Sequence, residues 1–129
     1  MIERWNPERH MPLLGRWLRE RGMAESAGWS EMYPPTGFVV DGIAIGFLYR
    51  TDAPHVAWLD GVVSDPGSGP LERAQALKSL ISELYAEADR QGVRLVFATT
   101  SAPSLVELGQ AHGAKILQRN HVCLARTKE

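Results

Sequence analysis

Hydrophobic positions along the chain predict three helices that alternate with shorter apolar strands. After an extended start at residues 1–5, apolar side chains recur with a helical period over residues 7–21, and Gly22 ends that helix. The same period makes the longest apolar stripe of the chain over residues 71–91. Pro103 opens a third, shorter helix, which ends before Gly113.

Between the first two helices, apolar runs predict three consecutive antiparallel strands. Residues 37–50 contain Asp41-Gly42 between two apolar runs, a pair typical of a tight hairpin because both positions must tolerate positive φ. Residues 56–63 are almost continuously apolar, as expected of a strand covered on both faces. Residues 94–100 predict a further buried strand, which the long connecting helix allows to lie parallel to residues 56–63.

The complete pattern predicts one α/β domain over residues 1–129. A last hairpin around Arg119-Asn120 gives the order β-α-(loop)-β-β-β-α-β-α-β-β, with helices on both faces of a mixed, mainly antiparallel sheet of about six to seven strands. Residues 23–36 have no clean period and end in a Pro-Pro break. They form a large loop or a frayed helix, where a binding surface could be built.

Composition and charge exclude several classes of function. The 14 basic and 15 acidic residues give a net charge of -1, which lacks the positive field typical of a nucleic-acid binder. The first residues carry no apolar signal core, and no apolar run approaches the roughly 20 residues of a membrane span, so we expect a cytoplasmic protein without membrane contact. The single Cys123 and the isolated histidines give no metal-ligand spacing, so no metal site is expected.

The stretch VVSDPGSGPLER before the long helix admits two interpretations. Gly67, Ser68 and Gly69 could let backbone N–H groups turn toward a phosphate at the positive end of the helix. The same residues could instead only cap the helix, with Pro70 at its first position and Glu72 completing a capping pattern. The second interpretation needs no ligand.

The element order, the Asp-Gly hairpin, the segment DGVVSDP before the long helix and the ending HGA of the short helix resemble the GNAT superfamily of acyl-CoA N-acyltransferases. The resemblance covers essentially the whole chain, but it lies more in architecture than in motif. In that family a segment R/Q-G-x-G-x-G/A holds the pyrophosphate of acetyl-CoA. Here Gly69 stands at the Arg/Gln position, Pro70 and Glu72 replace the first two glycines, and Ala74 matches the last small residue.

The resemblance implies acetyl-CoA as co-substrate and a defined set of residues around it. In the family, the backbone of the strand before the long helix holds the pantetheine, and the next loop holds the pyrophosphate. A serine near the start of the short helix could replace a family asparagine. The corresponding residues of this chain are Val62, Val63, Gly67, Ser68, Gly69, Arg73, Ala74 and Ser101.

Asp60 is the predicted catalytic residue, as a base or an anchor for the amine, because several GNAT enzymes carry an acidic residue at about this place. Alternatively, Asp60 is simply exposed on one pleat or satisfied by a bulge at Gly61. The tyrosine that many family members use as general acid would fall at Gly109 and is absent; Tyr33 or His112 could substitute.

Three functions remain open at this level. The first is an acetyl-CoA-dependent N-acetyltransferase that acts on a small-molecule or protein amine. For that acceptor, Trp29, Met32 and Tyr33 would line the pocket, although aromatic residues in an irregular segment can equally plug one end of a core. The second is a GNAT-like fold without catalysis that acts as a binding or interaction module. The third is a self-assembling subunit, a homodimer joined through Val122 and Leu124 of the last hairpin.

Overall fold

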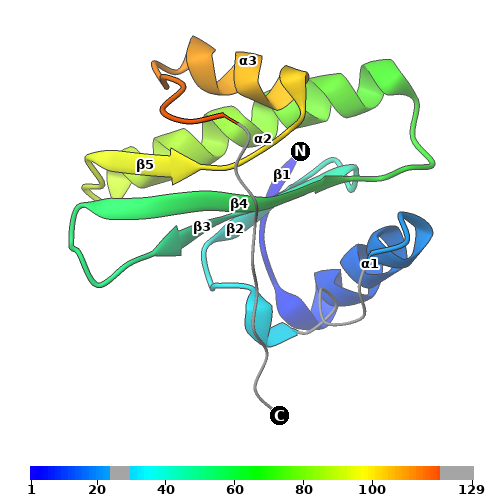
Figure 1. Cartoon of the computed structure of the whole chain (residues 1–129). Coiled ribbons are helices and arrows are strands. Elements are labelled where there is room, and N and C mark those ends of the chain that lie inside the picture. Colours follow the sequence, from blue (N-terminus) through cyan, green and yellow to red (C-terminus); the bar gives the residue numbers. More distant parts are fainter. Residues whose placement is uncertain (24–29, 120–129) are drawn as a thin grey trace.

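The fold is an open sheet with helices on both faces (Figure 1), seen in a computed structural model that describes residues 1–23 and 30–119. Helix α1 covers one face, and α2 and α3 lie on the other (Figure 1). The elements are β1 (Ile2–Arg4), α1 (Pro7–Glu20), the 3-10 turn η2 (Ser30–Met32), β2 (Gly37–Val40), β3 (Ala44–Arg50), β4 (Val56–Ser64), α2 (Pro70–Arg90), β5 (Leu95–Ala98) and α3 (Pro103–Ala111).

The strands lie in the sequential order β1-β2-β3-β4-β5. The first four form antiparallel pairs, and β5 runs parallel to β4, as the sequence predicts. The hairpin between β2 and β3 is confirmed, because Asp41 and Gly42 have φ of 54° and 64°. The long helix between β4 and β5 provides the crossover that a parallel pair requires.

The prediction of six to seven strands is wrong for the described residues, which form five. Residues 115–119, the beginning of the predicted last hairpin, are not a strand; the rest of that hairpin, with Cys123, Val122 and Leu124, lies outside the described residues, as does Trp29. Ile116 and Leu117 are 42% and 78% exposed, so burial does not hold this segment in a sheet.

The sheet separates two hydrophobic cores. The core under α2 contains Leu48, Leu59 and Leu84, whereas the core under α1 contains Trp17 and Phe47. Large side chains are almost completely buried in both, and burying each one contributes about 1.5–3 kcal/mol to folding.

One prediction about β4 is wrong. Ala57 and Leu59 are buried under α2, but Trp58, which lies between them on the opposite face, is 39% exposed. At its beginning, β4 is therefore covered on the α2 face but not on the other face, because α1 does not extend over this corner of the sheet (Figure 1).

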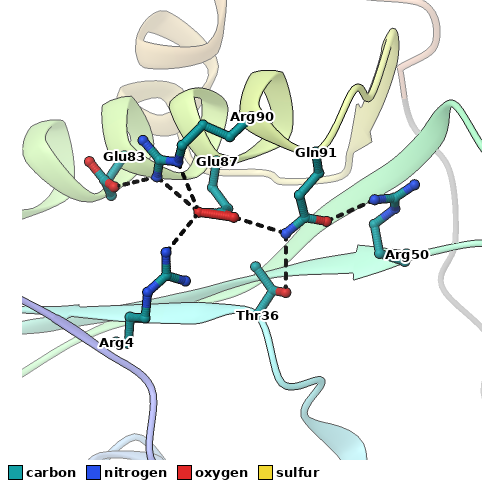
Figure 2. Close-up of polar contacts among 7 residues, drawn as sticks. All are labelled: Arg4, Thr36, Arg50, Glu83, Glu87, Arg90 and Gln91. Atoms are coloured by element: carbon teal, nitrogen blue, oxygen red, sulfur yellow. Dashed lines mark hydrogen bonds and ion pairs between the residues drawn. The ribbon is translucent and has the colours of Figure 1, made fainter.

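A polar network fixes the C-terminal end of α2 to the sheet (Figure 2). The carboxylate of Glu87, whose residue is 6% exposed, accepts hydrogen bonds from Arg4 at 3.2 Å, from Arg90 at 2.9 and 3.1 Å and from Gln91 at 3.0 Å. Gln91 also contacts Thr36 and accepts a hydrogen bond from Arg50. The Gln91 hydrogen bond is the main cause of a lowered pKa of Glu87, and the two arginines lower it further.

Candidate functional site

The two parallel strands of the sheet separate where β5 ends. Their pairing begins at Val56 and stops at the pair Leu59 and Ala98. Beyond this point β4 continues to Ser64, whereas the chain leaves β5 through Thr99 and turns up into α3 (Figure 1). No described strand follows β4 on this side after Leu59.

A cavity of about 110 Å³ occupies the opening; we call it the splay cavity. Its walls come from β4, α2, the end of β5 and α3. They are formed by Leu59, Asp60, Val62, Ile81, Tyr85, Ala98, Thr99, Thr100, Leu105 and Gly109. Because no described strand pairs with this edge of β4, its N–H and C=O groups are available to an extended ligand, as at other open sheet edges.

A bulge at Gly61 sets the direction of the side chains at the mouth of this cavity. The register between β3 and β4 shifts between Ile45 and Phe47, and Gly61 has φ of 67°. A Cβ atom at Gly61 would lie only 2.8 Å from Cδ2 of Phe47, so glycine is required for space as well as for φ. The bulge keeps Asp60 opposite Phe47, on the face of α1.

Asp60 is exposed and is also satisfied at the bulge. Its carboxylate accepts the N–H of Gly61 at 2.8 Å, and the residue is nevertheless exposed and lines the splay cavity. The pKa of Tyr49 on the neighbouring strand is raised well above its usual range, mainly by burial and then by the charge of Asp60. The Tyr49 hydroxyl therefore remains a proton donor at neutral pH, close to a carboxylate.

A wider groove of about 420 Å³ follows the splay cavity along α2 and α3; we call it the helix-start groove. Its lining residue Leu77 lies one turn before Ile81 of the splay cavity, so the two spaces succeed each other along α2. It is formed by Ser64, Pro70, Arg73, Ala74, Leu77, Lys78, Ser104, Glu107 and Leu108. Arg73 and Lys78 give it two cations, opposed by the carboxylate of Glu107.

The loop before α2 forms the predicted cap only in its backbone. Gly69 is the N-cap, Pro70 opens the helix and Glu72 lies in the first turn, but no side chain caps that turn. The Ser68 hydroxyl donates instead to Asp65 at 3.1 Å, and the Gly67 N–H donates to the same carboxylate at 2.8 Å. The N–H groups of the first helical turn therefore lack a side-chain acceptor, which leaves the positive end of the helix open to an anion.

The structure brings some of the predicted residues together and separates others. Asp60 and Val62 line the splay cavity, and Arg73 and Ala74 line the helix-start groove. Val63 is next to Val62, but its side chain packs into the core under α1. The loop residues Gly67, Ser68 and Gly69 lie between Ser64 and Pro70 of the groove, and Ser101 is exposed beside Thr100 without lining either space.

The two described residues of the predicted acceptor pocket have different surroundings. Met32 is 45% exposed at the end of η2. Tyr33 is half-buried, and its ring stacks on Phe47 at 4.8 Å and meets Trp5 at 5.9 Å. Tyr33 therefore closes one end of the core under α1, which was the second interpretation of this aromatic segment.

Sequence reasoning missed Tyr85 of α2, which lines the splay cavity. Its ring stacks on His112 with centroids 4.9 Å apart, and burial raises the pKa of its hydroxyl. That hydroxyl lies 3.8 Å from the position of a Cβ atom at Gly109, where the resemblance expects a tyrosine. In the sequence Tyr85 belongs to the apolar stripe of the long helix, so periodicity alone assigns it to the core.

The described part of the chain has neither a metal-binding cluster nor a membrane-spanning helix. Residues 1–23 and 30–119 contain no group of three His, Cys, Asp or Glu side chains that could hold a metal ion. None of the helices in these ranges is both long and apolar enough to cross a membrane.

Similar folds occur among solved acetyltransferase structures. No protein-family model and no curated protein sequence matches the chain. A Mycobacterium tuberculosis protein solved in complex with CoA superposes with a TM-score of 0.71 at 12% identity, over 95% of this chain and 76% of that one. Aminoglycoside N-acetyltransferase AAC(6')-Iy, solved with a bisubstrate analogue of CoA, gives 0.64 at 18% identity over 98% of both chains.

A third similar structure carries the family name. This acetyltransferase of the GNAT family from Novosphingobium aromaticivorans has a TM-score of 0.61 at 20% identity, over 87% of this chain and 50% of that one. These identities are low, so the similarity concerns the backbone arrangement and not particular side chains. The chain therefore has the GNAT acetyltransferase fold.

Proposed function

We propose that this protein is an acetyl-CoA-dependent N-acetyltransferase that transfers the acyl group to an amine. The observation that carries the proposal is the separation of β4 from β5 after Leu59 and Ala98, which leaves a cavity beside an unpaired strand edge. Similar structures with this fold were solved with CoA or with a CoA-containing bisubstrate analogue. A cytoplasmic location and a homodimer are further parts of the proposal, from the sequence.

The residues present fit acetyl-CoA at two places. The open edge of β4 at Val62 and Val63 offers backbone N–H and C=O groups to the amides of pantetheine. Arg73, Lys78 and the uncapped start of α2 offer positive charge to the diphosphate. Glu72 is the one misfit in the first turn, since its carboxylate oxygen lies 3.4 Å from the Cβ position of Gly69; it is exposed and can turn to solvent.

Three groups of the chain take part in the proposed reaction: Asp60, a backbone N–H of β4 and the Tyr85 hydroxyl. Acetyl-CoA supplies an acyl group activated as a thioester. Asp60 takes the proton that the amine must lose, directly or through water, and a backbone N–H of β4 polarises the carbonyl oxygen. As the C–N bond forms and the C–S bond breaks, the Tyr85 hydroxyl gives a proton to the departing thiolate and regains one from solvent. Burial keeps Tyr85 protonated until that moment, because it raises its pKa.

A second candidate function is a CoA-free interaction module with the same fold. The observation that favours it is the position of Glu72 over the start of α2, where it would repel a diphosphate. The two functions differ in one measurable property, the binding of CoA.

The test is isothermal titration of the protein with acetyl-CoA. We expect binding in the micromolar range, weakened about tenfold by Arg73→Ala and also weakened by Gly69→Asp, which adds a carboxylate to the loop. Arg16→Ala is the matched control, because Arg16 is exposed on α1, on the opposite face of the sheet. Absence of heat up to millimolar acetyl-CoA would exclude the transferase and leave the interaction module.

A further inference from the structure

Three aromatic side chains form a row across β3, β4 and β5 on the face of α1. Tyr49 lies opposite Trp58 in the ladder, and Trp58 lies opposite Phe97. The rings of Trp58 and Phe97 stack with centroids 5.0 Å apart and an interplanar angle of 28°. We call Tyr49, Trp58 and Phe97 the aromatic shelf.

Trp58 at the middle of the shelf is exposed, whereas Tyr49 and Phe97 on either side of it are half-buried. Trp58 is 39% exposed, and Leu95, two residues before Phe97 on the same face of β5, is 46% exposed. The core under α1 reaches Tyr49 but includes neither Trp58 nor Phe97. Large exposed apolar groups gathered in one patch are typical of binding sites, and a tryptophan offers a wide flat surface there.

A single carboxylate lies at the inner end of the shelf. Asp60 follows Trp58 by two residues and shares its face, and its charge contributes to the raised pKa of Tyr49. Asp60 also lines the splay cavity. It is the one acidic residue within β3, β4 and β5 of the described chain.

We infer that the acceptor is a monoamine with a flat aromatic body, whose ammonium binds Asp60 and whose ring lies on the aromatic shelf. The inference rests on the proposed function, because it supplies the second substrate of that reaction. One carboxylate balances one ammonium, and stacked aromatic rings favour a flat apolar body and tolerate the adjacent cation. A polycation would need several carboxylates, which these strands do not offer.

Asp60 lies where the two proposed substrate sites meet. Because Asp60 belongs both to the shelf face and to the wall of the splay cavity, an ammonium that binds it lies beside the place where the acyl group would be presented. The shelf then selects the body of the acceptor, while Asp60 selects and deprotonates its amine.

The experiment compares tryptamine, ethylamine and spermidine as acceptors, with release of the CoA thiol as the readout. We expect kcat/KM for tryptamine to exceed that for ethylamine and for spermidine at least tenfold. Trp58→Leu should remove most of this preference. Ile2→Ala is the control, because Ile2 is 44% exposed on β1, at the edge of the sheet opposite to β5. Equal rates for all three amines, or a preference that survives Trp58→Leu, would overturn the inference.

A binding experiment separates this inference from the proposed function. Titration of tryptamine into the protein without acetyl-CoA should give measurable heat, weakened at least fivefold by Asp60→Asn and by Trp58→Leu. If acetyl-CoA binds but tryptamine does not, the acceptor inference fails and the transferase proposal stands. If tryptamine binds but acetyl-CoA does not, the shelf is an amine site and the transferase proposal fails.

Discussion

The two ends of α2 differ in how their polar groups are used. At the C-terminal end, the buried carboxylate of Glu87 receives hydrogen bonds from Arg4, Arg90 and Gln91 (Figure 2). At the N-terminal end no side chain caps the first turn, and Arg73 makes only a long contact of 3.4 Å with the carbonyl of Pro66.

The difference indicates that the C-terminal end of α2 stabilises the fold, whereas its N-terminal end is available for binding. Groups that satisfy one another hold α2 against the sheet, and a ligand would have to break their bonds to use them. Groups left without such partners cost little stability and stay available to bind an anion. Substitutions at the C-terminal end should therefore change the free energy of unfolding, and substitutions at the N-terminal end should change affinity for CoA.

The largest expected effect is the loss of stability in Glu87→Ala. Removing the carboxylate leaves two arginines without their buried partner. We expect a loss of about 2 kcal/mol, less than the roughly 3–5 kcal/mol for fully buried pairs, because Arg4 and Arg90 reach water. Urea unfolding measures it. Glu83→Ala is the matched control, with a loss below about 1 kcal/mol, because Glu83 makes a single, partly exposed ion pair with Arg90. Equal losses in both variants would contradict the comparison.

Acid should remove part of the same stabilisation. The pKa of Glu87 in the folded protein is lowered from 4.5, so its contribution is complete above that value and is lost as pH falls through the lower, folded pKa. The effect is smaller than that of Glu87→Ala, because a protonated carboxyl group still fills its place. Urea midpoints of the native protein and of Glu87→Gln should differ by a constant amount from pH 7 to 5 and converge below pH 4. A constant difference down to pH 3 would contradict this account.

At the N-terminal end of α2, Arg73→Ala should lower the affinity for CoA and leave the free energy of unfolding almost unchanged. The predicted tenfold loss of CoA affinity corresponds to about 1.4 kcal/mol. The free energy of unfolding without ligand should stay within about 0.5 kcal/mol of the native value, because the one contact of Arg73 with Pro66 is long. A stability loss as large as that of Glu87→Ala would mean that this end of α2 is also an anchor.

The smallest expected effect is a gain in affinity from Glu72→Gln. Neutralising this carboxylate removes a repulsion toward a diphosphate, so we expect CoA to bind about threefold more tightly in low salt. The gain should disappear in 0.5 M salt (a Debye length of about 4 Å), because Glu72 is exposed and salt screens its charge. Titrations at both ionic strengths measure it, and a gain independent of salt would point to a steric cause.

Local chemistry explains the parts of the fold that the sequence predicts correctly. The turn at Asp41-Gly42 depends on two adjacent residues that accept positive φ, and the three helices depend on periods repeated over several turns. The turn residues Arg119-Asn120 predict a last hairpin, most of which lies outside the described residues. Its described segment, residues 115–119, lacks the buried face that a strand needs.

The site was less accessible to sequence reasoning, because it depends on distant elements. Asp60 was found through the family resemblance, but the bulge that directs it depends on the space around Phe47. The periodic positions of Tyr85 and Trp58 predict core residues. Tyr85 instead faces the splay cavity, because β5 ends early. Trp58 is exposed, because α1 does not extend over β5 and the beginning of β4.

The parallel pairing of β4 and β5 also has a consequence for the order of folding. The hairpins of β2, β3 and β4 join neighbouring segments, and such short-range contacts form early. β5 can join only after α2 has crossed the sheet, and it adds only four ladder pairs. We therefore expect β5 to assemble after the hairpins of β2, β3 and β4 and to open before them in native-state hydrogen exchange. The wall that β5 contributes to the splay cavity would then form later than the walls from β4 and α2.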